Sequence, residues 1–191
     1  MDYIEKIIKE GVNEKGFLSK DVMKILKSTT PVFCVDAVIV PESNRPEAVL
    51  FYRNDKESAN PNQYWIVGGR QRLGECMETT AERKIYEETG LEINISPDDQ
   101  LFAHNIIHKK GENGIWYSFF GDVSQEDARN LYHTPVVCYI ARTPSYEKIK
   151  EKIVAQGGHN NFKLFLQAES FLDKYVQKAM KVAWRRIGFR K

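Results

Sequence analysis

The sequence predicts a single α/β or α+β sandwich in which helices cover a mixed β-sheet. Two observations lead to this prediction. First, short runs of β-branched and aromatic residues are interspersed with segments that carry apolar residues at helical spacing. Second, the 191 residues are 42% hydrophobic and show no compositional break, which suits one domain with a proper core. We therefore expect one domain over residues 1–191, with extra helices towards both ends of the chain.

The overall composition argues against several classes of partner. The net charge of +2 is a small difference between 28 basic and 26 acidic residues, so neither nucleic acid nor a membrane is expected as the main partner. No apolar run approaches the roughly 20 residues that span a bilayer, and the N-terminus lacks the layout of a signal peptide. We therefore expect a soluble, cytoplasmic protein. Cys34, Cys76 and Cys138 are not closely spaced, so neither a zinc site nor a disulfide framework is indicated.

The first part of the chain is predicted to be helical. Residues 2–10 and 19–28 have apolar residues at helical spacing and are separated by glycines, and Ser19 suits an N-cap. Residues 1–29 therefore form a predicted helical lead-in.

The composition then changes to that of strands. Residues 32–40 and 48–53 are β-branched and aromatic and flank a loop of Pro, Ser and Asn, which predicts a pair of strands. Asp36 interrupts the first of them. A carboxylate in an apolar strand is costly unless it is paired, so we expect a partner arginine or a place at the rim of a site; an outward-facing surface aspartate is equally compatible.

The central stretch combines a strand, a glycine pair and a helix. The apolar run at 64–67 predicts a strand, and Gly68 and Gly69 after it predict a sharp turn of the backbone. Residues 76–89 are predicted to be helical, and Gly90 suits the left-handed position that ends a helix.

One face of this helix is expected to carry the chemistry. At about 100° per residue, Ala81 and Ile85 face a sheet, whereas four charged residues share another face. These are Arg83, Lys84, Glu87 and Glu88. The adjacent carboxylates form an oxygen-rich site suited to Mg²⁺ or Mn²⁺. The alternative is an ordinary solvated helix face, which such a pair more often represents.

The rest of the chain supplies further strands and two helices. Strands are predicted at 101–108, 134–142 and 162–165, and helices at 146–154 and about 169–187. Residues 109–114 read as a polar turn, and 123–132 as a loop or short helix. The basic residues at the end of the last helix, within 166–191, are interpreted as a helix-dipole and solubility feature.

The spacing of the central stretch resembles a known family motif. Gly69, Glu75 and Arg83, followed by the glutamate pair, Gly90 and Leu91, match the Nudix box GX5EX7REUXEEXGU, where U is aliphatic. The resemblance, over residues 69–91, implies a Nudix-type α/β/α sandwich with a mixed central sheet. The glutamate that the box has directly after its arginine is Lys84 here. In the family that glutamate binds metal or acts as base for attack on a diphosphate, so the substitution implies the loss of one metal and of that base.

A narrower resemblance extends beyond the box. Residues 28–40, the strand ending at Arg53, residues 65–70 and residues 158–163 are similar, in the same order, to stretches of the GDP-mannose mannosyl hydrolase branch. That branch also lacks the glutamate after the box arginine. It cleaves its nucleotide sugar at the sugar carbon, uses a histidine late in the chain as base, and is dimeric, so the resemblance implies a homodimer that takes a small nucleotide sugar.

Carried over by position, the resemblance implies a set of site residues. The catalytic group is His159, Arg70 and Asp36; the substrate-binding group is Arg53, Arg83 and His108; the ligands of Mg²⁺ or Mn²⁺ are the Gly68 carbonyl, Glu87 and Glu88. If water attacks the anomeric carbon, the base belongs beside the sugar, where His159 would stand. The branch has a glutamine ligand where this chain has Gly158, and Glu87 would compensate. The usual proline before the glycine pair is Val67.

Three functions are compatible with these residues. The first is a metal-dependent hydrolase of a nucleotide sugar that acts at the glycosyl carbon, favoured by Lys84, Asp36 and His159. The second is an ordinary Nudix pyrophosphohydrolase, favoured by the intact glutamate pair. The third is a catalytically silent Nudix module that binds a nucleotide.

Overall fold

The structure is a computed structural model that describes residues 33–54, 61–72, 74–110, 116–120, 132–155 and 161–189; at 107–110, 116–120, 132–133 and 153–155 it describes the backbone only. The predicted helices at 2–10 and 19–28, with the Ser19 cap, therefore lie outside the described residues. So do His159, residues 123–131 of the undetermined segment and the last two basic residues of the chain.

The described residues form one eight-stranded mixed sheet. Its strands are β1 (Cys34–Pro41), β2 (Ala48–Arg53), β3 (Gln63–Trp65), β4 (Val67–Arg70), β5 (Gln100–Lys110), β6 (Trp116–Phe120), β7 (Tyr132–Thr143) and β8 (Phe162–Phe165). The main order is β3-β2-β1-β7-β5-β6, while β4 pairs with β1 and β8 pairs with β2. β1 and β7 run parallel, and the other pairs are antiparallel.

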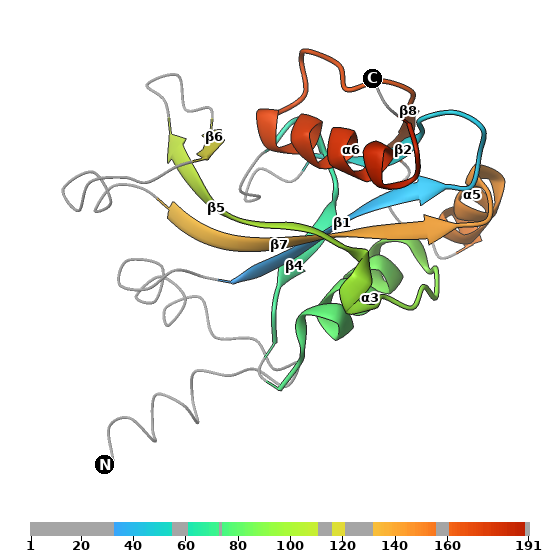
Figure 1. The fold of residues 1–191 in the computed structure, drawn as a ribbon, viewed down its shortest axis with the longest axis horizontal. Helices are drawn as coiled ribbons and strands as arrows, with labels where there is room; N and C mark the ends of the chain where they lie inside the picture. Colours follow the sequence, from blue (N-terminus) through green and yellow to red (C-terminus); the bar gives the residue numbers. More distant parts are fainter. Residues whose placement is uncertain are drawn as a thin grey trace.

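Helices cover both faces of the sheet (Figure 1). The helix α6 (Lys174–Arg186) lies on one face, and α3 (Met77–Thr89) and α5 (Tyr146–Ala155) lie on the other. Each face has its own apolar core, which is the arrangement that a layered α/β/α fold requires. The predicted sandwich with a mixed central sheet is confirmed.

The alternation of side chains along β1 separates the two cores. Val35, Ala37 and Ile39 belong to the core beneath α3 and α5, whereas Val38 and Val40 belong to the core beneath α6. Successive residues of a strand point to opposite faces, so this central strand is apolar on both sides and appears in the sequence as a nearly continuous apolar run.

The box helix α3 has the predicted boundaries and packing. The Sγ of Cys76 caps its start by accepting a hydrogen bond from the Thr79 backbone N–H at 3.4 Å, and Gly90 ends it with a left-handed φ of 70°. Ala81 and Ile85 are buried against the sheet, as the helical spacing predicted.

Most other predicted elements are confirmed to within a few residues, but four details differ. The sequence did not predict β6 or the short 3₁₀ turn Pro97–Asp99. The last helix begins at Lys174 instead of about residue 169, because the Asp173 carboxylate accepts a hydrogen bond from the Tyr175 backbone N–H at 2.7 Å and caps it there.

The glycine pair is the fourth difference. Gly68 and Gly69 do not form a sharp turn; they lie inside β4, opposite Asp36 and Val35 of β1.

Crossing a membrane requires a helix that is both long and apolar. None of the described helices combines the length and the apolar character that this requires.

Candidate functional site

The loop between β4 and α3 is anchored by the carboxylate of Glu75. Its Oε1 accepts a hydrogen bond from Arg83 Nε at 2.6 Å, and its Oε2 accepts one from Arg83 Nη2 at 2.9 Å. The Arg72 backbone N–H and the Thr80 hydroxyl also donate to Oε2, at 3.0 and 2.9 Å. These contacts, above all those with Arg83, lower the pKa of Glu75 to about 2, although burial opposes the shift.

Replacing Glu75 with glutamine is expected to lower the free energy of unfolding by about 2 kcal/mol at pH 7, because the loop loses its charge-assisted anchor. The folded-state pKa lies below the ordinary value of 4.5, so this contribution is complete above about pH 4.5 and is lost as the pH falls towards 2. Urea unfolding of both proteins at pH 7 and pH 3 tests this. A difference in the free energy of unfolding between the two proteins that is the same at both pH values would contradict this prediction. Glu92→Gln, at an exposed position, is the control.

Arg83 contacts protein groups through all three of its guanidinium nitrogens. Besides Glu75, it donates from Nη2 to the Arg70 carbonyl at 3.0 Å and from Nη1 to Glu87 at 3.3 Å. Burial lowers the pKa of Arg83, but its contacts with the two carboxylates outweigh that effect and leave it raised. The observed role of Arg83 is to join the loop, β4 and α3, and its contact with substrate stays a prediction.

Lys84 lies between the two glutamates at the end of α3. Its Nζ is 3.1 Å from Glu87 Oε2 and 3.2 Å from Glu88 Oε1. Glu87 also accepts a hydrogen bond from Arg72 Nη2 at 2.9 Å. Burial raises the pKa of Glu87, but Lys84 and Arg83 outweigh it and leave the pKa lowered. The predicted charged face of α3 is confirmed, and on it every carboxylate has a cationic partner.

A second polar cluster is centred on Asp36. This residue is 6% exposed, and its Oδ2 accepts a hydrogen bond from the Tyr175 hydroxyl at 2.8 Å. Burial raises the pKa of Asp36 to about 6, while Tyr175 and the charge of Arg53 act in the opposite direction. The Arg53 guanidinium lies over the Trp65 ring, 5.2 Å from its centroid. Asp36 is thus buried and partnered, which excludes the surface alternative.

The glycine pair allows the two clusters to approach β4 from opposite faces. A Cβ on Gly68 would lie 1.8 Å from Asp36 Oδ1, on the α6 side, and a Cβ on Gly69 would lie 3.0 Å from the Lys84 methylenes, on the α3 side. Adjacent strand residues point to opposite faces, so two consecutive glycines leave bare backbone between the clusters. The close approach of Asp36 and Lys84 to β4 therefore explains why Gly68 and Gly69 are both glycines, since they form no turn.

The structure brings together seven of the nine predicted site residues. Gly68 and Arg70 lie on β4, Asp36 on β1, which pairs with β4, Arg53 on β2, which also pairs with β1, and Arg83, Glu87 and Glu88 on α3. His108 lies on β5, opposite Ser118 of β6 and Tyr132 of β7, and only its backbone is described. The placement of His159 is outside the described residues, so its role stays a prediction.

Solved structures of other proteins share this arrangement of strands and helices. A mutT/nudix family protein from Listeria innocua matches with a TM-score of 0.53 at 18% identity, over 83% of this chain and 95% of that one. The NUDIX domain of Shewanella oneidensis NrtR, in complex with ADP ribose, matches with a TM-score of 0.51 at 15% identity, over 89% of this chain and 99% of that one.

The chain has the Nudix fold. Longer NrtR chains from Shewanella oneidensis also match: one at a TM-score of 0.51 and 19% identity, over 82% of this chain and 63% of that one, and another in complex with a 27mer DNA. This chain therefore spans less than two thirds of their length. No protein-family model matches the sequence, and no curated protein does.

As its side chains stand, this Nudix-like stretch does not fit a divalent cation between the glutamates. Mg²⁺ needs only one or two carboxylates, so their number is not the obstacle. The obstacle is the Lys84 ammonium, because like unit charges about 4 Å apart repel by about 4 kcal/mol near a protein surface, and a divalent ion doubles this. Within the described ranges, no three His, Cys, Asp or Glu side chains form a group that could hold a metal ion. The ligands Gly68, Glu87 and Glu88 stay a prediction.

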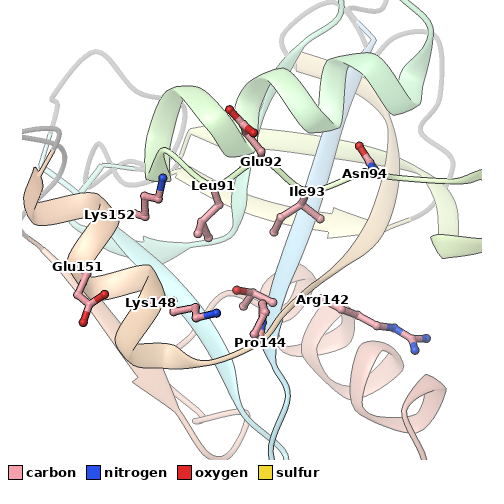
Figure 2. Close-up of a pocket in the computed structure, with 10 residues that line it drawn as sticks. Leu91, Glu92, Ile93, Asn94, Arg142, Pro144, Lys148, Glu151 and Lys152 are labelled. Atoms are coloured by element: carbon pink, nitrogen blue, oxygen red, sulfur yellow. The ribbon is translucent and has the colours of Figure 1, made fainter.

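A separate cleft lies beside the loop that follows the box helix (Figure 2). Its volume is about 580 Å³, and residues of the loop after α3, the end of β7 and α5 line it. They are Leu91, Glu92, Ile93, Asn94, Arg142, Thr143, Pro144, Lys148, Glu151 and Lys152. None of the predicted site residues is among them, so the two polar clusters beside β4 remain the candidate site.

Tyr175 is the site residue that the sequence interpretation missed. It appeared there as one of the apolar positions of the last helix, and it does pack in the core, at 1% exposed. Its hydroxyl reaches Asp36 from 139 positions further along the chain. A buried tyrosine needs a hydrogen-bond partner, and this need was the available signal, but nothing local identifies which residue provides it.

Proposed function

We propose that this chain is a Nudix hydrolase of a nucleotide sugar, GDP-mannose-like, in which water attacks the anomeric carbon and nucleoside diphosphate leaves. One observation carries the proposal. The residue after the box arginine is Lys84, and its ammonium is paired to Glu87 and Glu88. A protonated lysine in ion pairs is a poor base for water attack on phosphorus, whereas a positive charge there stabilises a departing diphosphate.

The residues take the following roles in this proposal. His159 removes a proton from the attacking water beside the sugar, on the face opposite the leaving group, so the sugar configuration inverts. Arg70, Arg53 and Lys84 balance the charge that grows on the diphosphate oxygen as the glycosidic bond breaks. Asp36, which accepts a hydrogen bond from Tyr175, supplies a negative charge that raises the pKa of Arg53 against the lowering effect of burial.

Two further features support a diphosphate-linked ligand. Cationic side chains gather on both sides of the bare backbone of β4: Arg53 on one side, Lys84 and Arg83 on the other. In addition, the NUDIX domain of NrtR, which shares the fold, is bound to ADP ribose, itself a nucleoside diphosphate sugar. The Mg²⁺ or Mn²⁺ expected from the resemblance stays a prediction, and no step above depends on it.

The same lysine supports a second candidate, a silent nucleotide-binding module. Replacing a box glutamate with lysine removes a catalytic group from an otherwise recognisable box. NrtR, which matches the fold, is seen with ADP ribose in one complex and with DNA in another. Measured binding without turnover would favour this candidate. The ordinary pyrophosphohydrolase, with attack at phosphorus, is the third.

One experiment separates the three. The protein is incubated with GDP-mannose, and in parallel with ADP-ribose, in oxygen-18 water, with Mg²⁺ and with EDTA, and the nucleotide products are analysed by mass spectrometry. Attack at carbon gives unlabelled GDP, whereas attack at phosphorus gives GMP or a labelled phosphate and would refute the proposal. The nucleotide is the product to read, because the anomeric oxygen of a free sugar exchanges with water. No turnover of either substrate, with binding retained, identifies the module.

A further inference from the structure

The position of Lys84 is fixed from several directions. Its side chain is 19% exposed, and its methylenes pass over β4 at Gly69, where a Cβ would lie only 3.0 Å away. Its ammonium reaches both Glu87 and Glu88 within 3.2 Å. Two ion pairs and a packed stem are what a lysine needs to stay in one place instead of sampling solvent.

The two glutamates differ in how much they depend on Lys84. Glu87 is also held by Arg72 at 2.9 Å and by Arg83 at 3.3 Å, so it keeps cationic partners if Lys84 is removed. For Glu88, Lys84 is the ion-pair partner that the structure shows. The sequence placed a divalent cation between these carboxylates, and the ammonium is now ion-paired to both of them.

Lys84 also acts across β4 on the second cluster. The charge of Glu88 raises the pKa of Asp36, and the charge of Lys84 lowers it. The charge of Glu88 also raises the pKa of Arg53. Cationic groups therefore lie close to the bare glycine backbone on both faces of β4, with Lys84 on one face and Arg53 on the other. Phosphate oxygens are recognised by such donors through charge-assisted hydrogen bonds, with or without a metal.

We propose that the Lys84 ammonium is the resident cation of this site: it takes the place of a divalent metal between Glu87 and Glu88, and the site binds a nucleoside diphosphate without a divalent cation. The metal part follows from the ion pairs alone. The choice of ligand rests on the proposed function.

The metal part is tested with Mn²⁺ and no nucleotide, by electron paramagnetic resonance of the free ion. Wild type is expected to bind Mn²⁺ weakly, and Lys84→Glu, which completes the box, at least about tenfold more tightly. Lys84→Met, which keeps the stem over Gly69 without the charge, is expected to lie between them. Lys150→Glu, the same charge change at an exposed position on α5, should behave as wild type. Equal Mn²⁺ affinity of wild type and folded Lys84→Glu overturns the proposal.

The ligand part is tested by calorimetric titration of GDP. Wild type is expected to bind GDP equally well in EDTA and in Mg²⁺, and Lys84→Met at least about tenfold more weakly in both. Lys84→Glu should lose GDP binding in EDTA and regain it with Mg²⁺. Thermal melts of each variant confirm folding. If the three neighbouring carboxylates of Lys84→Glu prevent that variant from folding, Lys84→Met carries the test instead. A strict Mg²⁺ requirement of the wild type for GDP overturns the proposal.

Failure of the proposed function gives a different pattern. If the chain hydrolyses nothing, or attacks phosphorus, the product assay reports it while the Mn²⁺ and GDP titrations are unaffected. If Lys84 is not the resident cation, wild type binds Mn²⁺ as tightly as Lys84→Glu, whatever the products of turnover.

Discussion

Replacing Gly68 with alanine is expected to destabilise the fold by about 3 kcal/mol. The added Cβ would lie 1.8 Å from Asp36 Oδ1 and 2.9 Å from the Val35 carbonyl oxygen, closer than real Cβ contacts allow. Asp36 is buried and bonded to Tyr175, and the Val35 oxygen belongs to a central strand, so neither can retreat without breaking other contacts. Urea or thermal unfolding monitored by circular dichroism measures the loss.

Gly69→Ala is the matched control for that substitution. It adds the same methyl one position along the same strand, but the nearest atoms are Lys84 methylenes at 3.0 Å, which can shift by a few tenths of an ångström while the ammonium keeps its ion pairs. We expect a loss below about 1 kcal/mol. Equal effects of the two substitutions would mean that backbone freedom of glycine, and not the close approach of Asp36, explains the requirement at Gly68.

The second large effect is expected in turnover. Replacing His159 with alanine should lower kcat by at least about a hundredfold if this histidine is the general base. The loss should be greatest near neutral pH and smaller at alkaline pH, where hydroxide replaces the base-assisted water. Steady-state release of GDP from GDP-mannose measures it, and binding of GDP should be unchanged because a base for attack at the anomeric carbon acts on the water and not on the nucleotide.

His104→Ala is the control for general effects of removing a histidine. His104 lies on β5 beside Lys178 of α6, and it is not among the predicted site residues. Its replacement should leave kcat within about twofold of wild type, once small stability effects are allowed for. Wild-type turnover in the His159 variant would remove that residue from the mechanism, and the base would then have to be sought elsewhere.

Local signals were sufficient for most of the fold. Gly90 ends α3 in a left-handed conformation, and Ala81 and Ile85 face the sheet, because end signals and helical spacing depend on a few neighbouring residues. The start of α6 needed only the Asp173 cap, which is also local and was overlooked. The layered sandwich followed from the order of such segments.

Long-range pairing decided what local signals did not. A glycine pair suits both a turn and a tightly approached strand, and β1 pairing selects the strand for Gly68 and Gly69. The motif placed Glu87 and Glu88 correctly on α3, yet the ion pairs to Lys84 depend on how its stem crosses β4. The contact of Tyr175 with Asp36 joins distant parts of the chain and has no local signature.

Because Gly68 and Gly69 have no side chains, charged groups on the two faces of β4 lie close to one another. Side chains of ordinary size would space the charges of α3 away from those beneath α6, and water or apolar atoms would fill the gap. Here Glu88 and Lys84 on one side act on Asp36 on the other. Glu88 raises and Lys84 lowers the pKa of Asp36, so removing either charge is expected to shift that pKa in the opposite direction, by less than burial and Tyr175 do.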